Sequence, residues 1–412
     1  MTETLGPQST AADDRSATWN RILRKAGLVY IFSRLCVLAG AAIVAAELQA
    51  DINQTKGIPN VPFPDPHIAG RPLPTSALAP ISDVLASWDG IWYLRIVRLG
   101  YPRHVRPNVT YFVPEARAAF FPTYPILVRG IDKVLPGGDT VAALFCNFVL
   151  GAIAIFLLGV LARRIYGEQI AAKAMVLGAM FPGSFVLSFA YSEALLLVLA
   201  MGCLWCLMSK RWIAAGVLAA LATATRPNGL ALVLACAVSA IMAIRSERDW
   251  KSLAAPLLAP LGFVAFQLWL GQHTGEAGVW FRIQTEAWGE GASFGLTAVR
   301  KTFDAFAHPL TSSTNVITAA SIMAMLLLIY FLWVRRLPLP MVAYSAGILV
   351  LMLIPNTVTA RPRFLYTAFP LLISAAAFLH SDRRDWWPYI IGACSAGLVT
   401  LTALYGVFGA IP

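Results

Sequence analysis

The chain has 412 residues, of which 58% are hydrophobic and only 13% are charged, and its formal net charge is +11. Soluble proteins are about a quarter charged, so this composition excludes an ordinary soluble enzyme and indicates an integral membrane protein. Most basic residues sit in short connections between apolar runs of about twenty residues, the length of helix that crosses about 30 Å of hydrocarbon. The positive charge is therefore interpreted as a topology signal and not as a nucleic-acid binding surface.

The chain begins with a polar stretch. Residues 1–18 are too hydrophilic for a cleavable signal peptide, so a disordered tail is predicted there. Basic residues at positions 21–25 precede a first apolar span near 27–47, which by the positive-inside rule places the amino terminus in the cytoplasm. Residues 48–139 then form a first extracytoplasmic loop, a Pro-rich coil followed by amphipathic pieces. Residues 19–412 are predicted to be a single transmembrane domain.

Ten further apolar segments bring the expected number of crossings to about eleven, in an all-α polytopic fold. They lie near 140–162, 170–189, 190–209, 212–226, 227–244, 252–272, 314–334, 339–356, 364–380 and 387–410. Alternate connections carry basic residues, all on the predicted cytoplasmic side: Arg163 with Arg164, Lys210 with Arg211, Arg245 with Arg248 and Lys251, Arg335 with Arg336, and Arg383 with Arg384. This agreement with the charge rule supports the predicted topology.

The opposite, outer face collects ionisable residues that the charge rule does not explain. They are Asp89, which stands among aromatics in Ser87–Tyr93, and Glu115, Glu193, Arg226, Arg361, Arg363 and His308, with Glu286 and His273 as weaker candidates. Each has a simpler interpretation as a solvated loop acid, an interfacial arginine anchor or a loop-closing histidine. Arginines at the ends of apolar spans nevertheless tend to have a partner, because a charge drawn into the bilayer is costly.

As a set, an acid that accepts a proton and arginines that hold an anion are the parts required for group transfer from a phosphorylated donor. The sequence has no Gly-rich nucleotide loop between a strand and a helix, which disfavours a water-soluble nucleotide sugar. A lipid-linked phosphate suits the chain better, because its tail enters between helices while its head group meets the arginines. A lone aspartate with arginines is a poor ligand set for a metal, and the six cysteines lie almost entirely in apolar runs.

Several short motifs on the outer face, in this order, resemble the PIG-V family of mannosyltransferases. They are Trp88–Tyr93, Gly100–Tyr101, Phe120–Pro125, Tyr191–Glu193 and Thr225–Gly229. The resemblance covers about residues 20–380 and implies a polytopic glycosyltransferase of the GT-C class with a large first outer loop. The family has bacterial, notably actinobacterial, relatives.

The resemblance implies that Asp89 is the catalytic base and Trp88 its neighbour. It also implies a polyprenyl-phosphate-linked mannose as donor, a membrane-bound glycolipid or glycan as acceptor, membrane lipids as surroundings and no cofactor. Glu193 and Arg226 match recurring family positions. The turn Arg361–Phe364 is similar to a late basic motif, so both of its arginines join Arg226 and His308 as candidate ligands of the donor phosphate.

The remaining site candidates are side chains expected to contact the sugars. Trp88, Trp92 and Tyr93 can stack on sugar faces or belong to an interfacial aromatic belt. Glu115 and Glu193 can orient hydroxyl groups. Two alternatives to a mannosyltransferase stay open: a transporter or flippase of a lipid-linked sugar, and a GT-C enzyme that moves another sugar such as an arabinosyl group. The predicted location is the cytoplasmic membrane, with the site on its outer face.

Overall fold

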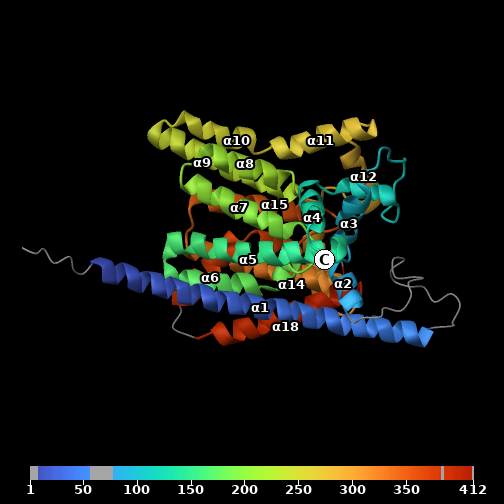
Figure 1. Ribbon diagram of the computed structural model, residues 1–412, viewed down its shortest axis with the longest axis horizontal. Coiled ribbons are helices and arrows are strands. Elements are labelled where there is room, and N and C mark those ends of the chain that lie inside the picture. The colour runs from blue at the N-terminus through green and yellow to red at the C-terminus, as the bar shows by residue number, and fades with distance from the viewer. Residues whose placement is uncertain (1–7, 56–77, 382–384, 411–412) are drawn as a thin grey trace, which may run out of the picture.

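The computed structural model describes residues 8–55, 78–381 and 385–410. Within these ranges the chain is helical, and the only extended pairing is an isolated bridge between Ala292 and Pro355. The long helices lie side by side with nearly parallel axes (Figure 1). The predicted all-α class is confirmed.

The first part of the chain supplies a long helix, then short helical pieces at one end of the molecule, and then helices that run along it. Their bounds are α1 (Gln8–Thr55), α2 (Leu78–Leu85), α3 (Asp89–Leu99), η1 (Pro114–Ala119), α4 (Thr123–Asp132), α5 (Gly138–Tyr166), α6 (Glu168–Met180), η2 (Pro182–Leu187), α7 (Glu193–Met208) and α8 (Trp212–Thr223).

The second part repeats this alternation of long helices and short pieces. Its elements are η3 (Pro227–Leu230), α9 (Ala231–Glu247), η4 (Trp250–Leu253), α10 (Ala254–Leu258), α11 (Leu261–Thr274), α12 (Val279–Trp288), α13 (Leu296–Ala307), α14 (Ser313–Val334), α15 (Leu339–Leu353), α16 (Pro362–Thr367), α17 (Pro370–Ser381) and α18 (Trp387–Gly406).

The helices pack in layers around one large apolar core. In these layers α1 runs along α18, α5 contacts both α6 and α7, and α9 packs on α15. A second, smaller apolar cluster joins α3 and η1 to α11 and α12 at the end of the molecule where the short helices gather. The two clusters meet around Phe120, which packs against both.

Six stretches of the described chain are long and apolar enough to cross a membrane, as expected for a multi-pass membrane protein. They are Ala17–Leu48, Gly138–Tyr166, Pro227–Glu247, Trp250–Thr274, Ser313–Val334 and Trp387–Gly406. Four apolar helices are shorter, namely α7, α8, α15 and α17. The expected count of eleven is therefore not confirmed.

The shortfall has a physical origin at one end of the bundle. A crossing needs about twenty helical residues, and α7 has only 16. The helices α6, α8 and α15 stop early and α7 and α17 start late at the same end, next to η2, η3 and α16. Irregular backbone is tolerated at membrane depth where it is buried in protein or lines a cavity, so the shortened ends indicate where a site is built.

The basic connections meet at the other end of the bundle. Arg164 donates hydrogen bonds of 2.6 Å to Met208 O and Ser209 Oγ, Lys210 Nζ lies 2.5 Å from Glu247, and the Tyr166 hydroxyl donates to Arg336 O at 2.6 Å. Connections that are far apart in the sequence are thus tied together, as the charge pattern predicted. The pair Arg383 and Arg384 falls outside the described residues.

Two predictions about the amino-terminal region can be compared with the structure over only part of their residues. Residues 1–7 of the predicted tail lie outside the described residues, but α1 begins at Gln8, so residues 8–18 are helical where disorder was expected. In the predicted first outer loop, residues 56–77 are likewise outside the description. From Leu78 onward that loop consists of the short helices α2, α3, η1 and α4.

Candidate active site

Asp89 is the first residue of α3, where the positive end of the helix dipole favours a carboxylate. Trp88, the preceding residue, has φ 56° and ψ −120°, a left-handed backbone conformation that costs a side-chain-bearing residue about 1–3 kcal/mol. The end of α18 holds it there: Trp88 Nε1 donates to Tyr405 O at 2.9 Å, and the indole packs 5.1 Å from the ring of Phe408. Asp89 is thereby aimed by a strained residue that the last helix fixes in place.

Arg226 is positioned by the motif Thr225–Gly229. Because a residue before proline is pushed out of the helical region, Arg226 is extended, at φ −158° and ψ 154°, and Pro227 starts the turn η3. A side chain at Gly229 would lie 2.5 Å from the backbone of Ala222, so only glycine lets η3 rest on α8. The motif therefore bends the chain back over α8 and points the Arg226 guanidinium group toward Asp89 and Glu193.

The motif Arg361–Phe364 also has an extended arginine before a proline, but its two arginines point to different places. Arg361 is extended, Pro362 begins α16, and α16 fits closely because a side chain at Gly183 would meet Pro362 O at 2.3 Å. Arg363, on the helix, faces Asp89. Arg361 turns away and donates to Thr318 Oγ1 at 2.6 Å and Thr359 O at 2.8 Å, and burial lowers its pKa to about 10.

Two carboxylates and two guanidinium groups form a compact ionic cluster, made of Asp89, Glu193, Arg226 and Arg363. Arg363 Nη1 donates to Asp89 Oδ2 at 2.6 Å and lies 3.7 Å from Glu193 Oε1. Arg226 Nη1 lies 2.8 Å from Glu193 Oε2 and 3.6 Å from Asp89 Oδ2. The Arg226–Glu193 contact is an ion pair without hydrogen-bond alignment, because neither Glu193 oxygen has a hydrogen-bond partner among the described residues.

The four side chains of the ionic cluster differ in their exposed fractions. The Glu193 side chain is 1% exposed, Arg363 7% and Arg226 10%, whereas Asp89 is 18% exposed. Burial by itself would lower the pKa of Arg226 and of Arg363, but the neighbouring acids outweigh it and raise the pKa of both. Both guanidinium groups therefore remain charged, and Asp89 is the acid that a substrate can reach.

Tyr93 and Ser192 extend the cluster by one hydrogen-bonded link. The Tyr93 hydroxyl lies 2.7 Å from Ser192 Oγ, which also accepts from Arg226 Nη1 at 3.3 Å. Burial raises the pKa of Tyr93, so its hydroxyl stays protonated. The ring stands edge-on to Phe120 at 5.1 Å.

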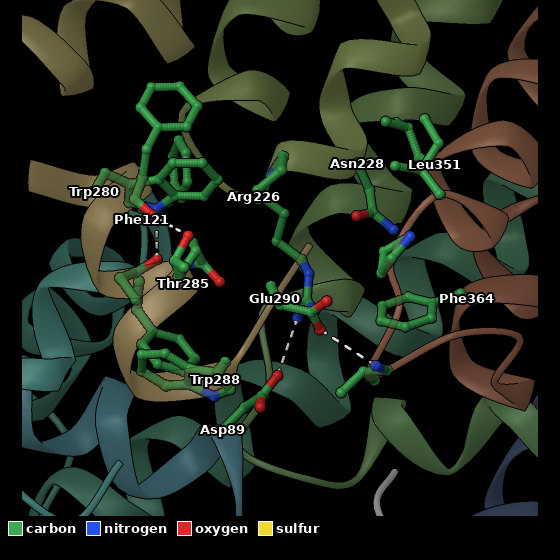
Figure 2. A pocket seen from close by; sticks show the side chains of 18 of the residues that line it. Asp89, Phe121, Arg226, Asn228, Trp280, Thr285, Trp288, Glu290, Leu351 and Phe364 are labelled. Carbon is green, nitrogen blue, oxygen red and sulfur yellow. Dashed lines mark hydrogen bonds and ion pairs between the residues drawn. The ribbon is translucent and has the colours of Figure 1, made fainter. Parts of the chain in front are cut away.

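The cluster forms the floor of a partly open cavity of about 460 Å³. In Figure 2, Asp89, Arg226 and Glu290 lie between an aromatic wall and an apolar wall. The aromatic wall comprises Phe121, Trp280 and Trp288 with Thr285, and the apolar wall comprises Leu351 and Phe364 with Asn228. A charged floor between two such walls suits an amphipathic substrate with an anionic centre.

The structure brings some of the predicted site residues together and leaves others apart. Asp89, Tyr93, Arg226 and Arg363 line the cavity, and Glu193 lies directly behind it in the ionic cluster. The other candidates do not line it: Trp88, Trp92, Glu115, Arg361 and His308.

Several candidates from the sequence that do not line the cavity have contacts elsewhere in the molecule. Glu115 pairs with Arg106 at 3.0 Å, and Glu286 accepts from Arg282 and from Val109 N. His308 ends α13 and is exposed. Trp92 is buried beneath the aromatic wall, 6.1 Å from Trp288.

Glu290 is a cavity residue that the sequence interpretation did not select. Its carboxylate accepts from Val358 N at 3.2 Å and joins the loop after α12 to the loop after α15, as a dashed line in Figure 2 shows. Asn228, Gln284 and Trp288 were also missed as site residues. For the residues of α12 the available signal was the four-residue spacing of Trp280, Gln284 and Trp288, which puts all three on one face of a helix, and for Asn228 it was its place in the motif Thr225–Gly229.

Comparison with known proteins gives one family match. A family model described as Mannosyltransferase (PIG-V) matches residues 75–258. The resemblance to the PIG-V mannosyltransferases is thereby confirmed. The PIG-V match contains Asp89, Glu193 and Arg226, whereas α12 and Arg363 lie beyond it. No curated protein matches the chain.

Solved structures similar to this chain include ArnT from Cupriavidus metallidurans bound to undecaprenyl phosphate, at 15% identity and a TM-score of 0.49. That similarity covers 73% of this chain and 56% of ArnT. The oligosaccharyltransferase AglB from Archaeoglobus fulgidus, in complex with an inhibitory peptide and a dolichol-phosphate, is 15% identical at a TM-score of 0.37, covering 91% of this chain and 55% of AglB. The chain thus spans little more than half the length of either protein.

Proposed function

We propose that the chain is a GT-C glycosyltransferase that moves mannose from polyprenyl-phosphate mannose to a membrane-bound glycolipid or glycan. The observation that carries the proposal is the ionic cluster: Asp89 reaches the cavity while two charged arginines stand on the same floor. The family match supports a mannosyl group as the one transferred.

The proposed reaction is a single displacement with inversion at the anomeric carbon. An acceptor hydroxyl attacks that carbon, Asp89 takes the hydroxyl proton, and the bond to the phosphate oxygen breaks. The leaving polyprenyl phosphate changes from a singly charged diester to a more highly charged monoester. Arg226 and Arg363 therefore stabilise the transition state more than the substrate, which lowers the barrier.

Without substrate, the arginines and acids neutralise one another. Arg363 donates to Asp89 Oδ2, so in the proposed reaction Asp89 exchanges this contact for the acceptor hydroxyl. The donor phosphate supplies the means, because guanidinium groups bind phosphate as readily as carboxylate. Glu193, buried behind both arginines, keeps them in place during this exchange of partners. No metal has a step in the proposal, since both carboxylates already have cationic partners.

We further propose that the protein lies in the cytoplasmic membrane with the basic connections inside and the ionic cluster on the outer side. The tied basic connections at one end of the bundle support this orientation, since lysine and arginine in short loops stay in the cytoplasm. Reporter fusions after Arg164 and after Pro309 test it. A cytoplasmic signal from the fusion after Pro309 would overturn it.

The test of the reaction uses the purified protein in lipid nanodiscs with polyprenyl-phosphate mannose carrying a labelled sugar. Label should appear in the lipid or glycan acceptor with an inverted anomeric linkage, and GDP-mannose should give none. Transfer from GDP-mannose alone would overturn the choice of donor. In proteoliposomes, movement of intact donor across the bilayer without transfer would instead identify a flippase.

A further inference from the structure

The helix α12 presents a face to the cavity for which neither the family match nor the ionic cluster provides a use. Trp280, Gln284, Thr285 and Trp288 of this helix all line the cavity. Its outward side is clamped: Arg282 pairs with Glu276 at 2.6 Å and Glu286 at 2.8 Å, and it also donates to Val105 O. The helix is thus held firmly from outside and leaves its inward side chains free to contact a ligand.

The two indoles on this face are fixed in orientation. Trp280 Nε1 donates to Ala119 O at 2.9 Å, and its ring stands edge-on to Phe121 at 5.9 Å. Trp288 packs edge-on against Phe120 and Tyr111, each at 5.7 Å. Rigid aromatic faces of this kind supply contact area at little cost in entropy, and the C–H faces of a sugar ring pack well on them.

Two side-chain amides face the cavity without partners among the described residues, one between the indoles and one on the opposite wall. Across the part of the chain that the structure describes, the side-chain amide of Gln284 makes no hydrogen bond, and neither does that of Asn228 on the opposite wall. An amide offers both donors and an acceptor, which matches adjacent sugar hydroxyls. Figure 2 shows Thr285 on the same wall, between Phe121 and Trp288, and its hydroxyl donates to Phe281 O at 3.3 Å.

We propose that the inward face of α12, with Asn228 across the cavity, is the subsite for the acceptor sugar, a neutral pyranoside. A neutral sugar suits this face because none of the α12 side chains that line the cavity is charged, and the charged groups of the cavity, among them Glu290, lie beside the face rather than on it. Trp288 and Asp89 line the same cavity, so a sugar on the α12 face can present a hydroxyl to Asp89, whereas Phe364 and Leu351 form the opposite wall in Figure 2, which suits the isoprenoid chain of the donor. This inference rests on the proposed function, whose acceptor it specifies.

Two variants and one control separate this subsite from the rest of the cavity. Gln284→Ala removes the free amide, and Trp288→Leu removes an indole. Trp269→Leu is the matched control, because Trp269 lies on α11 and lines a separate apolar cavity. With octyl α-mannopyranoside as acceptor, both subsite variants should raise its KM by about tenfold, as expected for the loss of one good contact, and change the KM of the donor less than twofold.

A binding measurement that needs no turnover distinguishes failure of the subsite from failure of the proposed reaction. Saturation-transfer NMR with methyl α-mannopyranoside should show ring-proton signals for the wild type and Trp269→Leu, and none for Trp288→Leu or Gln284→Ala. If the wild type transfers no sugar but shows this pattern of NMR signals, the proposed subsite is supported and the proposed reaction is contradicted. Equal signals in all four proteins, or subsite variants that raise only the KM of the donor, would overturn the subsite.

Discussion

Two regions of the molecule bury arginines, and they do so in opposite ways. Arg34 of α1 is 4% exposed and uses its five N–H groups in five hydrogen bonds. Its partners are Ser33 Oγ, Ser184 O, Ser184 Oγ, Ser188 Oγ and Ala179 O, at 2.7 to 3.2 Å. None of these partners is an acid, and the bonds tie α1 to α6 and η2.

The arginines of the ionic cluster are only partly satisfied. Arg363 donates one hydrogen bond to a described residue, and its buried Nε has no partner among the described residues. Arg226 likewise donates one, to Ser192. Both line the cavity, while Arg34 does not. The difference teaches that a saturated arginine fastens helices together, whereas an arginine with spare donors beside a cavity is prepared for a ligand.

Among changes to the buried arginines, the largest effect on turnover is expected from Arg363→Ala. It should lower kcat by about 10²- to 10³-fold, the cost of a lost oxyanion donor, about 2.7–4 kcal/mol. Removal of a buried cation also lowers the unfolding midpoint in detergent, but stability should fall far less than activity, because Arg226 still pairs with Glu193 and lies 3.6 Å from Asp89. Equal losses of activity and of folded protein would show that Arg363 is a structural anchor like Arg34.

Arg34→Met should do the reverse. It leaves the buried acceptor Ser184 O without its Arg34 donor, at about 1–3 kcal/mol, and removes the bonds to Ala179 O and Ser188 Oγ. The unfolding midpoint should therefore fall, while kcat per folded molecule stays within twofold of the wild type. A selective loss of turnover in well-folded Arg34→Met protein would remove the distinction between the two kinds of arginine.

A smaller loss of turnover than for Arg363→Ala is expected from Glu193→Gln. This residue touches both arginines but is itself 1% exposed, so it positions them without meeting the substrate. We expect about a tenfold loss of kcat, about 1.4 kcal/mol. Combined with Arg226→Met, the losses should be less than additive, since each change disrupts the same pair. Full additivity in this double-mutant cycle would mean that Glu193 acts independently of Arg226.

The sequence predicted the class of the fold and half of the site for identifiable reasons. Hydrophobic runs and basic connections report directly on spans and topology, so the membrane class and the grouping of the charged ends were accessible. The motifs around Asp89 and Arg226 combine a charged residue with glycine or proline, which mark turns, so they could be recognised in the sequence. Their meeting with Glu193 followed from their placement on one face.

The other residues of the candidate site could not be predicted, because residue spacing does not tell in which direction a side chain points. Arg361 and Arg363 are two residues apart on either side of Pro362, and only the course of α16 decides that Arg363 enters the cavity while Arg361 bonds to Thr318. The expected count of eleven spans is not confirmed, because several helices bordering the cavity are shorter than the about twenty residues of a typical crossing. Glu290 reaches the cavity through a contact between loops remote in sequence, with Val358 as partner.

The most direct test of the account compares Asp89→Asn with the wild type for mannose transfer from polyprenyl-phosphate mannose. Asp139→Asn is the matched control, because Asp139 is also paired with an arginine, Arg98 at 2.8 Å, but lies outside the cavity. We predict that Asp89→Asn lowers kcat by about 10²- to 10⁴-fold, as expected for loss of a general base, while the control keeps its rate. Unchanged turnover in well-folded Asp89→Asn protein would contradict the assignment of Asp89 as the base.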